Sequence, residues 1–156
     1  MNLPPPPIPS FQRKEDADHL QLLAIFHFIG GGLALIGLLF IFGHYMVFHA
    51  FFENPQVWTQ VQHQNPQQAF PQQFPPQQFF MMFRFMYVIF AVWFVGSGVL
   101  NVISGFCISA RKHRTFSIVV AAINCLHIPL GTVLGVFTII VMMRDSVREI
   151  YENPQA

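Results

Sequence analysis

Charged residues are scarce in this chain of 156 residues, where Asp, Glu, Lys and Arg together make up 10%. A soluble domain usually carries about a quarter of its residues as charged side chains. The scarcity therefore excludes an ordinary water-soluble domain. The formal net charge of +1 gives no basis for nucleic-acid binding, so nucleic acid is not expected as a partner.

Cysteine is nearly absent as well, with only Cys107 and Cys125 in the chain, and both fall inside apolar runs. A disulfide framework or a zinc site needs more ligands than these. We interpret both cysteines as packing residues and expect no bound metal.

The usual catalytic patterns are also missing. The sequence has no Gly-rich loop beside a Lys-Ser/Thr pair, no paired carboxylates, and no Ser or Cys flanked by a plausible base. The run "GGGLALIG" at 30–37 indicates a small-residue helix face and not a phosphate loop. We expect no enzyme activity.

Three long apolar runs dominate what is present: Leu22–Phe52, Phe79–Ala110 and Phe116–Met143. Each exceeds the roughly 18 apolar residues that indicate a membrane span. The first run lacks a small-x-small cleavage site, so it is predicted to be a retained helix and not a signal peptide. The predicted fold is an all-α membrane protein with three transmembrane helices, the second and third forming a tight hairpin and the third kinked at Pro129. The predicted segments are a Pro-rich, charged tail (1–19), helix one (20–52), an extracytoplasmic Gln/Pro-rich loop (53–78), helix two (79–110), helix three (115–143) and a juxtamembrane tail (144–156).

The Gln/Pro-rich loop contains the quasi-repeat "FPQQFPPQQF" and almost no charge. Such a composition cannot form a sizeable core. We interpret it as a flexible solvated loop, with contact to headgroups or to a partner groove as the alternative.

The basic turn "RKHR" at 111–114 favours the cytoplasmic side of the membrane. This places the N-terminus inside and the Gln/Pro-rich loop outside. Arg144 and Arg148 would then lie outside, against the same rule. The alternative is a re-entrant bend at Pro129, which would bring the C-terminus back inside, and the sequence leaves it open.

Small and polar residues recur at helical spacing in all three runs. In lipid, helices associate through close approach at small residues and through polar side chains that bond across helices. The stripes therefore predict a compact bundle or an equivalent oligomer. They are His27, Gly30, Ala34, Gly37 and His44; Ser97, Asn101, Ser104 and Gly105; and Ser117, Ala121, Asn124, His127, Gly131, Gly135 and Thr138.

Distance from the turn near residues 112–113 predicts which residues share a depth. Asn101 and Asn124 are both about eleven residues from it at about 1.5 Å per residue. Since an unpaired amide in hydrocarbon is costly, we predict that the two amides bond to each other. The same count places His127 level with Gly98 and Pro129 level with Gly96. Arg84 falls level with about residue 141, close enough to form an ion pair with Asp145 or to reach the outer interface.

His27 and His127 could join the two asparagines in one mid-depth polar cluster. We interpret the cluster as polar contacts between packed helices. A proton or solute path is the alternative, because intramembrane ionisable groups are functional hypotheses. Haem ligation by the two histidines is a third, although their predicted depths differ by about 8 Å.

The stretch "HIPLGTVLGVF" at 127–137 interrupts the third run. Pro129 removes one backbone hydrogen bond, and Thr132 is placed to bond back to the Pro129 carbonyl. Gly131 and Gly135 form a small-x-x-x-small pattern that lets another helix approach. We predict a kinked docking face and not a catalytic site.

Two stretches, 16–35 ("DADHLQLLAIFHFIGGGLAL") and 111–151, resemble a group of small bacterial integral membrane proteins of unknown function. Asp145 stands where that group has proline. The resemblance implies a bacterial membrane protein with no assigned activity. The matching positions are His19, Leu20, Leu22, Leu23, Phe26 and His27, then Cys125, Pro129, Gly131, Thr132, Leu134, Gly135, Phe137, Thr138, Arg144, Ser146 and Val147.

These observations predict a protein of the bacterial cytoplasmic membrane with its N-terminus inside. The expected role is non-catalytic, as an accessory or scaffold subunit that packs through Gly-rich faces with itself or with a larger membrane complex. A small oligomeric transporter or channel component is the alternative, and a haem-binding redox subunit is the third. Membrane lipid is the remaining expected partner.

Overall fold

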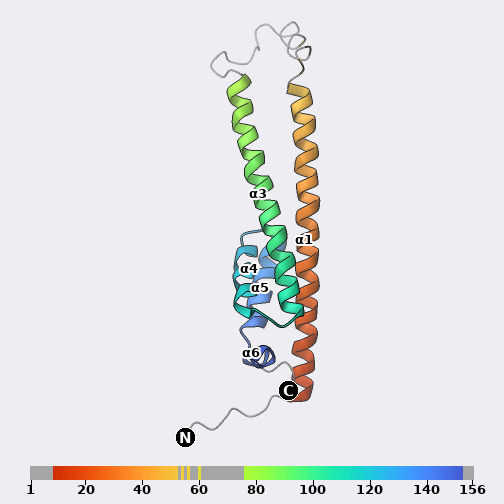
Figure 1. Ribbon diagram of the computed structural model, residues 1–156, viewed down its shortest axis with the longest axis vertical. Helices are drawn as coiled ribbons and strands as arrows, with labels where there is room; N and C mark the ends of the chain where they lie inside the picture. The colour runs from red at the N-terminus through yellow and green to blue at the C-terminus, as the bar shows by residue number, and fades with distance from the viewer. Residues whose placement is uncertain (1–8, 53, 55, 57–59, 61–75, 153–156) are drawn as a thin grey trace. The chain divides into compact units, whose positions relative to one another are not determined.

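The computed structural model describes residues 9–52, 54, 56, 60 and 76–152, and its regular elements in these ranges are all helices. The Gln/Pro-rich loop and the N-terminal proline run, on which sequence interpretations were placed, lie almost wholly outside them. Figure 1 shows the helices in chain order: α1 (Ser10–Phe52), α3 (Pro76–Ser109), α4 (Arg114–Asn124), α5 (Leu130–Met142) and α6 (Asp145–Glu152).

The chain divides into two compact units, described separately below. Unit 1 comprises Met1–Leu33 and Ser97–Ala156, and unit 2 comprises Ala34–Gly96. Both α1 and α3 therefore contribute one part to each unit.

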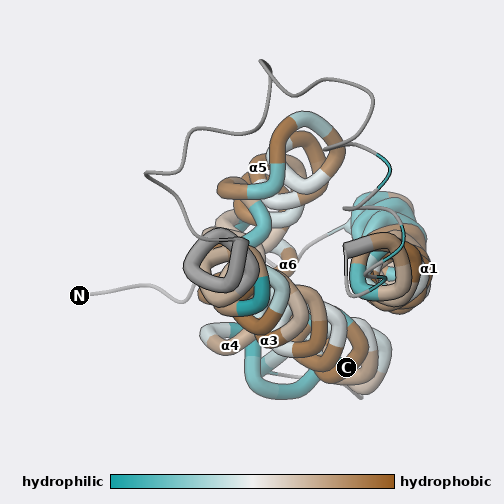
Figure 2. The backbone as a smooth tube through the Cα atoms, turned by 90° about the horizontal axis from the view of Figure 1, so that it is seen from above, coloured by the Kyte–Doolittle hydropathy of each residue, from teal (hydrophilic) through white to brown (hydrophobic). Residues whose placement is uncertain are grey.

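Helices α1 and α3 are long and apolar enough to cross a membrane. Their 43 and 34 residues correspond to about 65 and 51 Å, beyond the roughly 30 Å of a hydrocarbon core. Helix α1 contains no proline. The one proline of α3 is Pro76 at its first position, where the missing N–H is tolerated. Hydrophobic residues predominate along α3 (Figure 2), as an apolar solvent requires.

A tight turn joins α3 to α4. Arg111 and His113 adopt left-handed conformations with φ of 53° and 52°, and the Lys112 amide donates to the Cys107 carbonyl at 2.9 Å. The basic turn predicted between the second and third runs is therefore present, and α4 begins directly after it.

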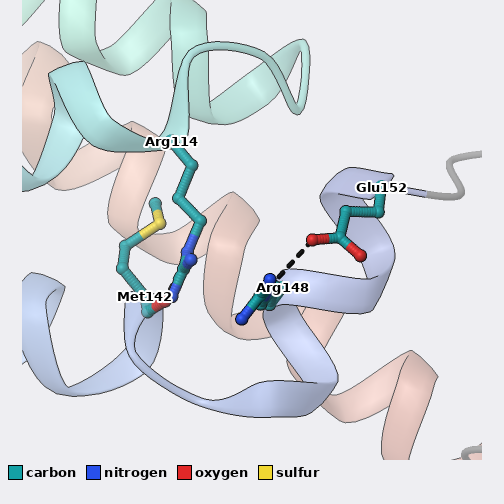
Figure 3. Close-up of polar contacts among 4 residues, drawn as sticks. All are labelled: Arg114, Met142, Arg148 and Glu152. Carbon is teal, nitrogen blue, oxygen red and sulfur yellow. Dashed lines mark hydrogen bonds and ion pairs between the residues drawn. The ribbon is translucent and has the colours of Figure 1, made fainter.

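The prediction of a single kinked helix over 115–143 is wrong. The third run forms two helices, α4 and α5, whose far ends meet: Arg114 Nε donates to the Met142 carbonyl at 2.8 Å. In one continuous helix these residues would lie about 42 Å apart. Figure 3 shows Arg114 reaching across to Met142. The chain reverses between Asn124 and Leu130, which is the re-entrant alternative that the sequence left open.

The reversal follows from the residues at the bend. Pro129 cannot donate a backbone hydrogen bond and disfavours helix before it. The Thr132 hydroxyl donates to the Cys125 carbonyl at 2.9 Å, and not to the Pro129 carbonyl as predicted. Because α4 ends there, Cys125 has a carbonyl that this hydroxyl satisfies. The Pro129 carbonyl instead accepts from the Val133 amide at 3.3 Å.

Glycines allow α4 and α5 to pack closely. A β-carbon at Gly131 would lie 2.6 Å from the Asn124 carbonyl oxygen, and one at Gly135 would lie 2.6 Å from Cys125 Sγ and against the Ala121 carbonyl. The predicted small-x-x-x-small pattern therefore serves an approach between the two halves of the third run. Each half, at about 16–20 Å, reaches only part of the way through a bilayer.

The hydrophobic core of unit 1 joins the beginning and the end of the chain. Leu23, Val141, Met142 and Val147 have exposed fractions of 0%. Helix α6 is amphipathic and turns its apolar side to this core, while Arg148 and Glu152 pair on the other side (Figure 3). The core residues are Leu20, Leu23, Ala24, Ile108, Val141, Met142, Val147 and Ile150.

Unit 2 consists of the later part of α1 packed on the earlier part of α3. Aromatic rings form much of this contact, with Tyr45 edge-on to Tyr87 at 5.3 Å and Phe48 beside Phe83 at 5.3 Å. His44 Nδ1 and the Tyr87 hydroxyl are hydrogen-bonded at 2.6 Å. Gly37 lies against the Phe94 ring, so its missing side chain makes room for that ring.

Candidate functional site

The centre of unit 1 contains a reciprocal pair of amides. Asn101 Nδ2 of α3 donates to Asn124 Oδ1 of α4 at 2.9 Å, and Asn124 Nδ2 donates back to Asn101 Oδ1 at 2.7 Å. Asn101 Nδ2 also donates to the Ser97 carbonyl at 2.9 Å. Both side chains are buried. The predicted Asn–Asn bond is confirmed.

Gly30 of α1 and Leu134 of α5 complete the surroundings of this pair. A β-carbon at Gly30 would lie 3.5 Å from Asn101 Oδ1 and 3.9 Å from Leu134 Cδ2. The small residue therefore brings α1 against the amides. The predicted stripe residues Gly30, Asn101 and Asn124 meet in one place, at the junction of four helices.

His27 lies one helical turn from Gly30 and is fully buried. Its Nδ1 bonds to the Leu23 carbonyl at 3.0 Å, while no hydrogen-bond partner is present for its Nε2 among the described residues. The bond to a carbonyl requires a proton on Nδ1 of the neutral ring. Nε2 is therefore left as a buried acceptor.

Two hydroxyls from the predicted stripes are buried in the same unit. The Ser104 and Ser117 side chains are fully buried, and neither hydroxyl has a partner in the described part of the chain. The Thr138 hydroxyl donates to the Leu134 carbonyl at 2.7 Å. Because Ser104 and His27 each lie one turn from the Asn101–Gly30 contact, on antiparallel helices, the helical register places them at a similar level.

His127 lies in the bend and not on a helix face. Its side chain packs against Gly131, and its backbone amide donates to the Asn124 carbonyl at 2.9 Å. Its predicted pairing with Gly98 assumed a straight third helix, so the reversal removes the basis for it. The Gly98 carbonyl instead lies 3.4 Å from the β-carbon position of Gly31 on α1.

The pairing of Pro129 with Gly96 loses its basis for the same reason. Gly96 belongs to unit 2, and nothing lies within 4 Å of its β-carbon position. Pro129 belongs to unit 1, where it stands directly before α5. The two residues therefore have separate structural roles.

The predicted ion pair between Arg84 and Asp145 is absent from the ion pairs of the described residues. The chain reversal returns Asp145 to the end of unit 1 that holds the start of α1. There the neighbouring Arg144 pairs with Asp16 at 3.1 Å, and Asp16 is 2% exposed. Sequence reasoning missed this pair. Asp16 shares a helix face with Leu20 and Leu23, and a carboxylate on an apolar face is a signal for a buried cation.

These contacts join helices and offer little for chemistry. Amide groups do not titrate, and the two asparagines satisfy each other. In the described ranges no three His, Cys, Asp or Glu side chains are grouped so that they could hold a metal ion. What the arrangement can do is fix four helices against one another in a medium where unpaired polar groups are costly.

Comparison with known proteins adds no assignment. No family model, no curated protein and no solved structure matches the chain.

Proposed function

We propose that the protein is a non-catalytic integral membrane protein, an accessory or scaffold subunit that packs with itself or with a larger membrane complex. The observation that carries the proposal is the apolar surface of unit 2, where side chains such as Phe40 and Val92 are 73% and 67% exposed. Such a surface requires lipid or another apolar helix around it.

Glycines on this surface favour a helix as part of its surroundings. Nothing lies within 4 Å of the β-carbon positions of Gly43 on α1 and Gly96 on α3. In lipid, open small residues are where another helix can approach closely. The sequence also predicts glycine faces for association at Gly30, Gly37, Gly131 and Gly135. These glycines contact other helices of the same chain, so the proposal rests on the open glycines Gly43 and Gly96.

We further propose a bacterial cytoplasmic membrane with the N-terminus inside. All Lys and Arg residues except Arg84 fall in unit 1. The bonds from Arg144 to Asp16 and from Arg114 to Met142 bring the C-terminal cations to the same end as the N-terminal segment and the basic turn. In this arrangement Arg144 and Arg148 obey the positive-inside rule, which a straight third helix would break.

Purification of the full chain in mild detergent tests the role. We expect a fixed partner or a defined oligomer, and we expect Gly43→Ile to weaken that association because the new side chain occupies the open approach. Val133→Leu, at an exposed position of α5 in unit 1, serves as the control and should leave the association unchanged. A wild-type chain that stays monomeric without a partner would contradict the proposal.

A transport or channel component is the second candidate. The observation that favours it is the set of buried polar atoms at His27, Ser104 and Ser117 that find no partner among the residues described by the structure. Such atoms often mark sites of unassigned water or ions. Solute or proton flux in liposomes that disappears in Ser104→Ala would support this candidate over the scaffold. A Soret band in the purified protein would instead support the haem alternative.

A further inference from the structure

Unit 2 contains a groove between α1 and α3, with a volume of about 320 Å³. We call it the Arg84 groove, because Arg84 is the only charged residue among the described residues that line it. The lining residues are Leu38, Ile41, Phe42, Tyr45, Arg84, Tyr87, Val88 and Ala91.

The groove is polar at one end and apolar at the other. Tyr45 and Arg84 mark one end, and Leu38 and Ala91 mark the other, because the two helices run antiparallel. Seven residues separate the ends on each helix, which corresponds to about 10 Å. A ligand that fits this gradient has a polar group joined to an apolar chain.

Arg84 places an isolated cation at the polar end of the groove. It is the only Lys or Arg between Lys14 and Arg111, and the ion pairs among the described residues do not include it. Its side chain is exposed on a helix that is otherwise apolar. A cation at such a position is costly unless a counter-charge or water reaches it.

The aromatic residues near Arg84 indicate the depth of the groove. Tyrosines are enriched where the hydrocarbon meets the headgroups. Tyr45 and Tyr87 both line the groove, and the Tyr87 hydroxyl is hydrogen-bonded to His44. Arg84 itself lies five residues after Phe79, where the apolar run of α3 begins in the sequence. The polar end therefore lies where lipid phosphates are found.

We propose that the Arg84 groove binds one anionic phospholipid of the surrounding bilayer. The guanidinium of Arg84 donates to the phosphate, for which its planar fork is suited. The first part of an acyl chain lies along Leu38, Ile41, Val88 and Ala91. This binding is independent of the scaffold role, since it needs only α1 and α3 of unit 2.

Native mass spectrometry of the delipidated full chain in detergent tests the proposal. Phosphatidylglycerol and phosphatidylcholine with the same acyl chains are titrated in parallel. We expect one phosphatidylglycerol to bind the wild type about tenfold more tightly, because the choline cation of phosphatidylcholine opposes Arg84 although its phosphate is the same. Arg84→Gln should abolish that preference and Arg84→Lys should keep part of it.

Three controls separate this site from other causes. Arg148→Gln removes an exposed cation outside the groove and should keep the full preference. Val88→Trp fills the groove at a largely exposed position and should weaken the binding of phosphatidylglycerol, with circular dichroism to check helicity. Glycerol 1-phosphate, which has no acyl chain, should not displace the lipid.

Several results would overturn the proposal. Equal binding of the two lipids by the wild type, or an unchanged preference in Arg84→Gln, would show that Arg84 contacts only solvent. An equal loss in Arg148→Gln would indicate a non-specific charge effect. Displacement by glycerol 1-phosphate would indicate a site for a free anion.

Discussion

Gly135→Ala distinguishes the re-entrant hairpin from a straight third helix by the sign of its effect. In the hairpin, the added β-carbon would lie 2.6 Å from Cys125 Sγ and 3.0 Å from the Cys125 amide nitrogen, and against the Ala121 carbonyl oxygen. Carbon atoms prefer separations of about 3.5–4.0 Å from such neighbours. Because two of the three contacts are backbone atoms, a side-chain rotation cannot relieve the overlap.

The magnitude follows from two opposing terms. Overpacking of this kind costs about 1–3 kcal/mol, and the gain in helix propensity from Gly to Ala is about 1 kcal/mol. We therefore expect Gly135→Ala to lower the free energy of unfolding by about 1 kcal/mol. In a straight helix only the propensity term would remain, and the variant would be more stable than the wild type.

Reversible unfolding in mixed micelles, followed by circular dichroism, measures the difference. Gly43→Ala is the matched control, because nothing lies within 4 Å of its β-carbon position, and it should be neutral or stabilising. A stabilising Gly135→Ala would refute the close approach of α4 and α5. So would equal effects of the two substitutions.

Three further predictions concern unit 1. Asn101→Leu and Asn124→Leu should each lower the unfolding free energy by about 1–3 kcal/mol. A double-mutant cycle of the two should give a coupling energy of about 0.6–2 kcal/mol. Strictly additive effects would contradict the reciprocal bond. Arg144→Gln should destabilise by about 1–3 kcal/mol because it leaves a buried carboxylate without its cation, whereas Arg148→Gln, from an exposed pair, should change stability by less than about 1 kcal/mol. In a chain without its native cysteines, Glu152→Cys should react with an impermeant maleimide only after the cells are opened; labelling in intact cells would place the C-terminus outside.

The sequence predicted the features that depend on local chemistry. The apolar runs predicted α1 and α3 to within a few residues at their C-terminal ends, and counting from the basic turn predicted the bond between Asn101 and Asn124. That count succeeded because α3 and α4 are uninterrupted between the turn and these two residues, so equal residue numbers correspond to equal lengths. The count fails beyond Asn124, because it assumes that the helix continues.

The reversal at Pro129 could not be decided from the sequence. The same proline and glycines are compatible with a kink or with a hairpin, and the choice depends on whether the freed carbonyls find partners. Here Thr132 reaches Cys125 and the glycines admit the second helix, which are contacts between residues on opposite sides of the bend. The conflict of Arg144 and Arg148 with the positive-inside rule was the signal that pointed to the hairpin.

The ion pair between Asp16 and Arg144 joins residues 128 positions apart in the chain. During synthesis, α1 emerges long before its partners, so the face that carries Asp16, Leu20 and Leu23 lacks most of its complement until α5 and α6 have been made. Contacts this distant in sequence are slow to form. Unit 1 can therefore close only after α6 has been made, and loss of α6 would remove Val147 and Ile150 from the core against which α1 packs.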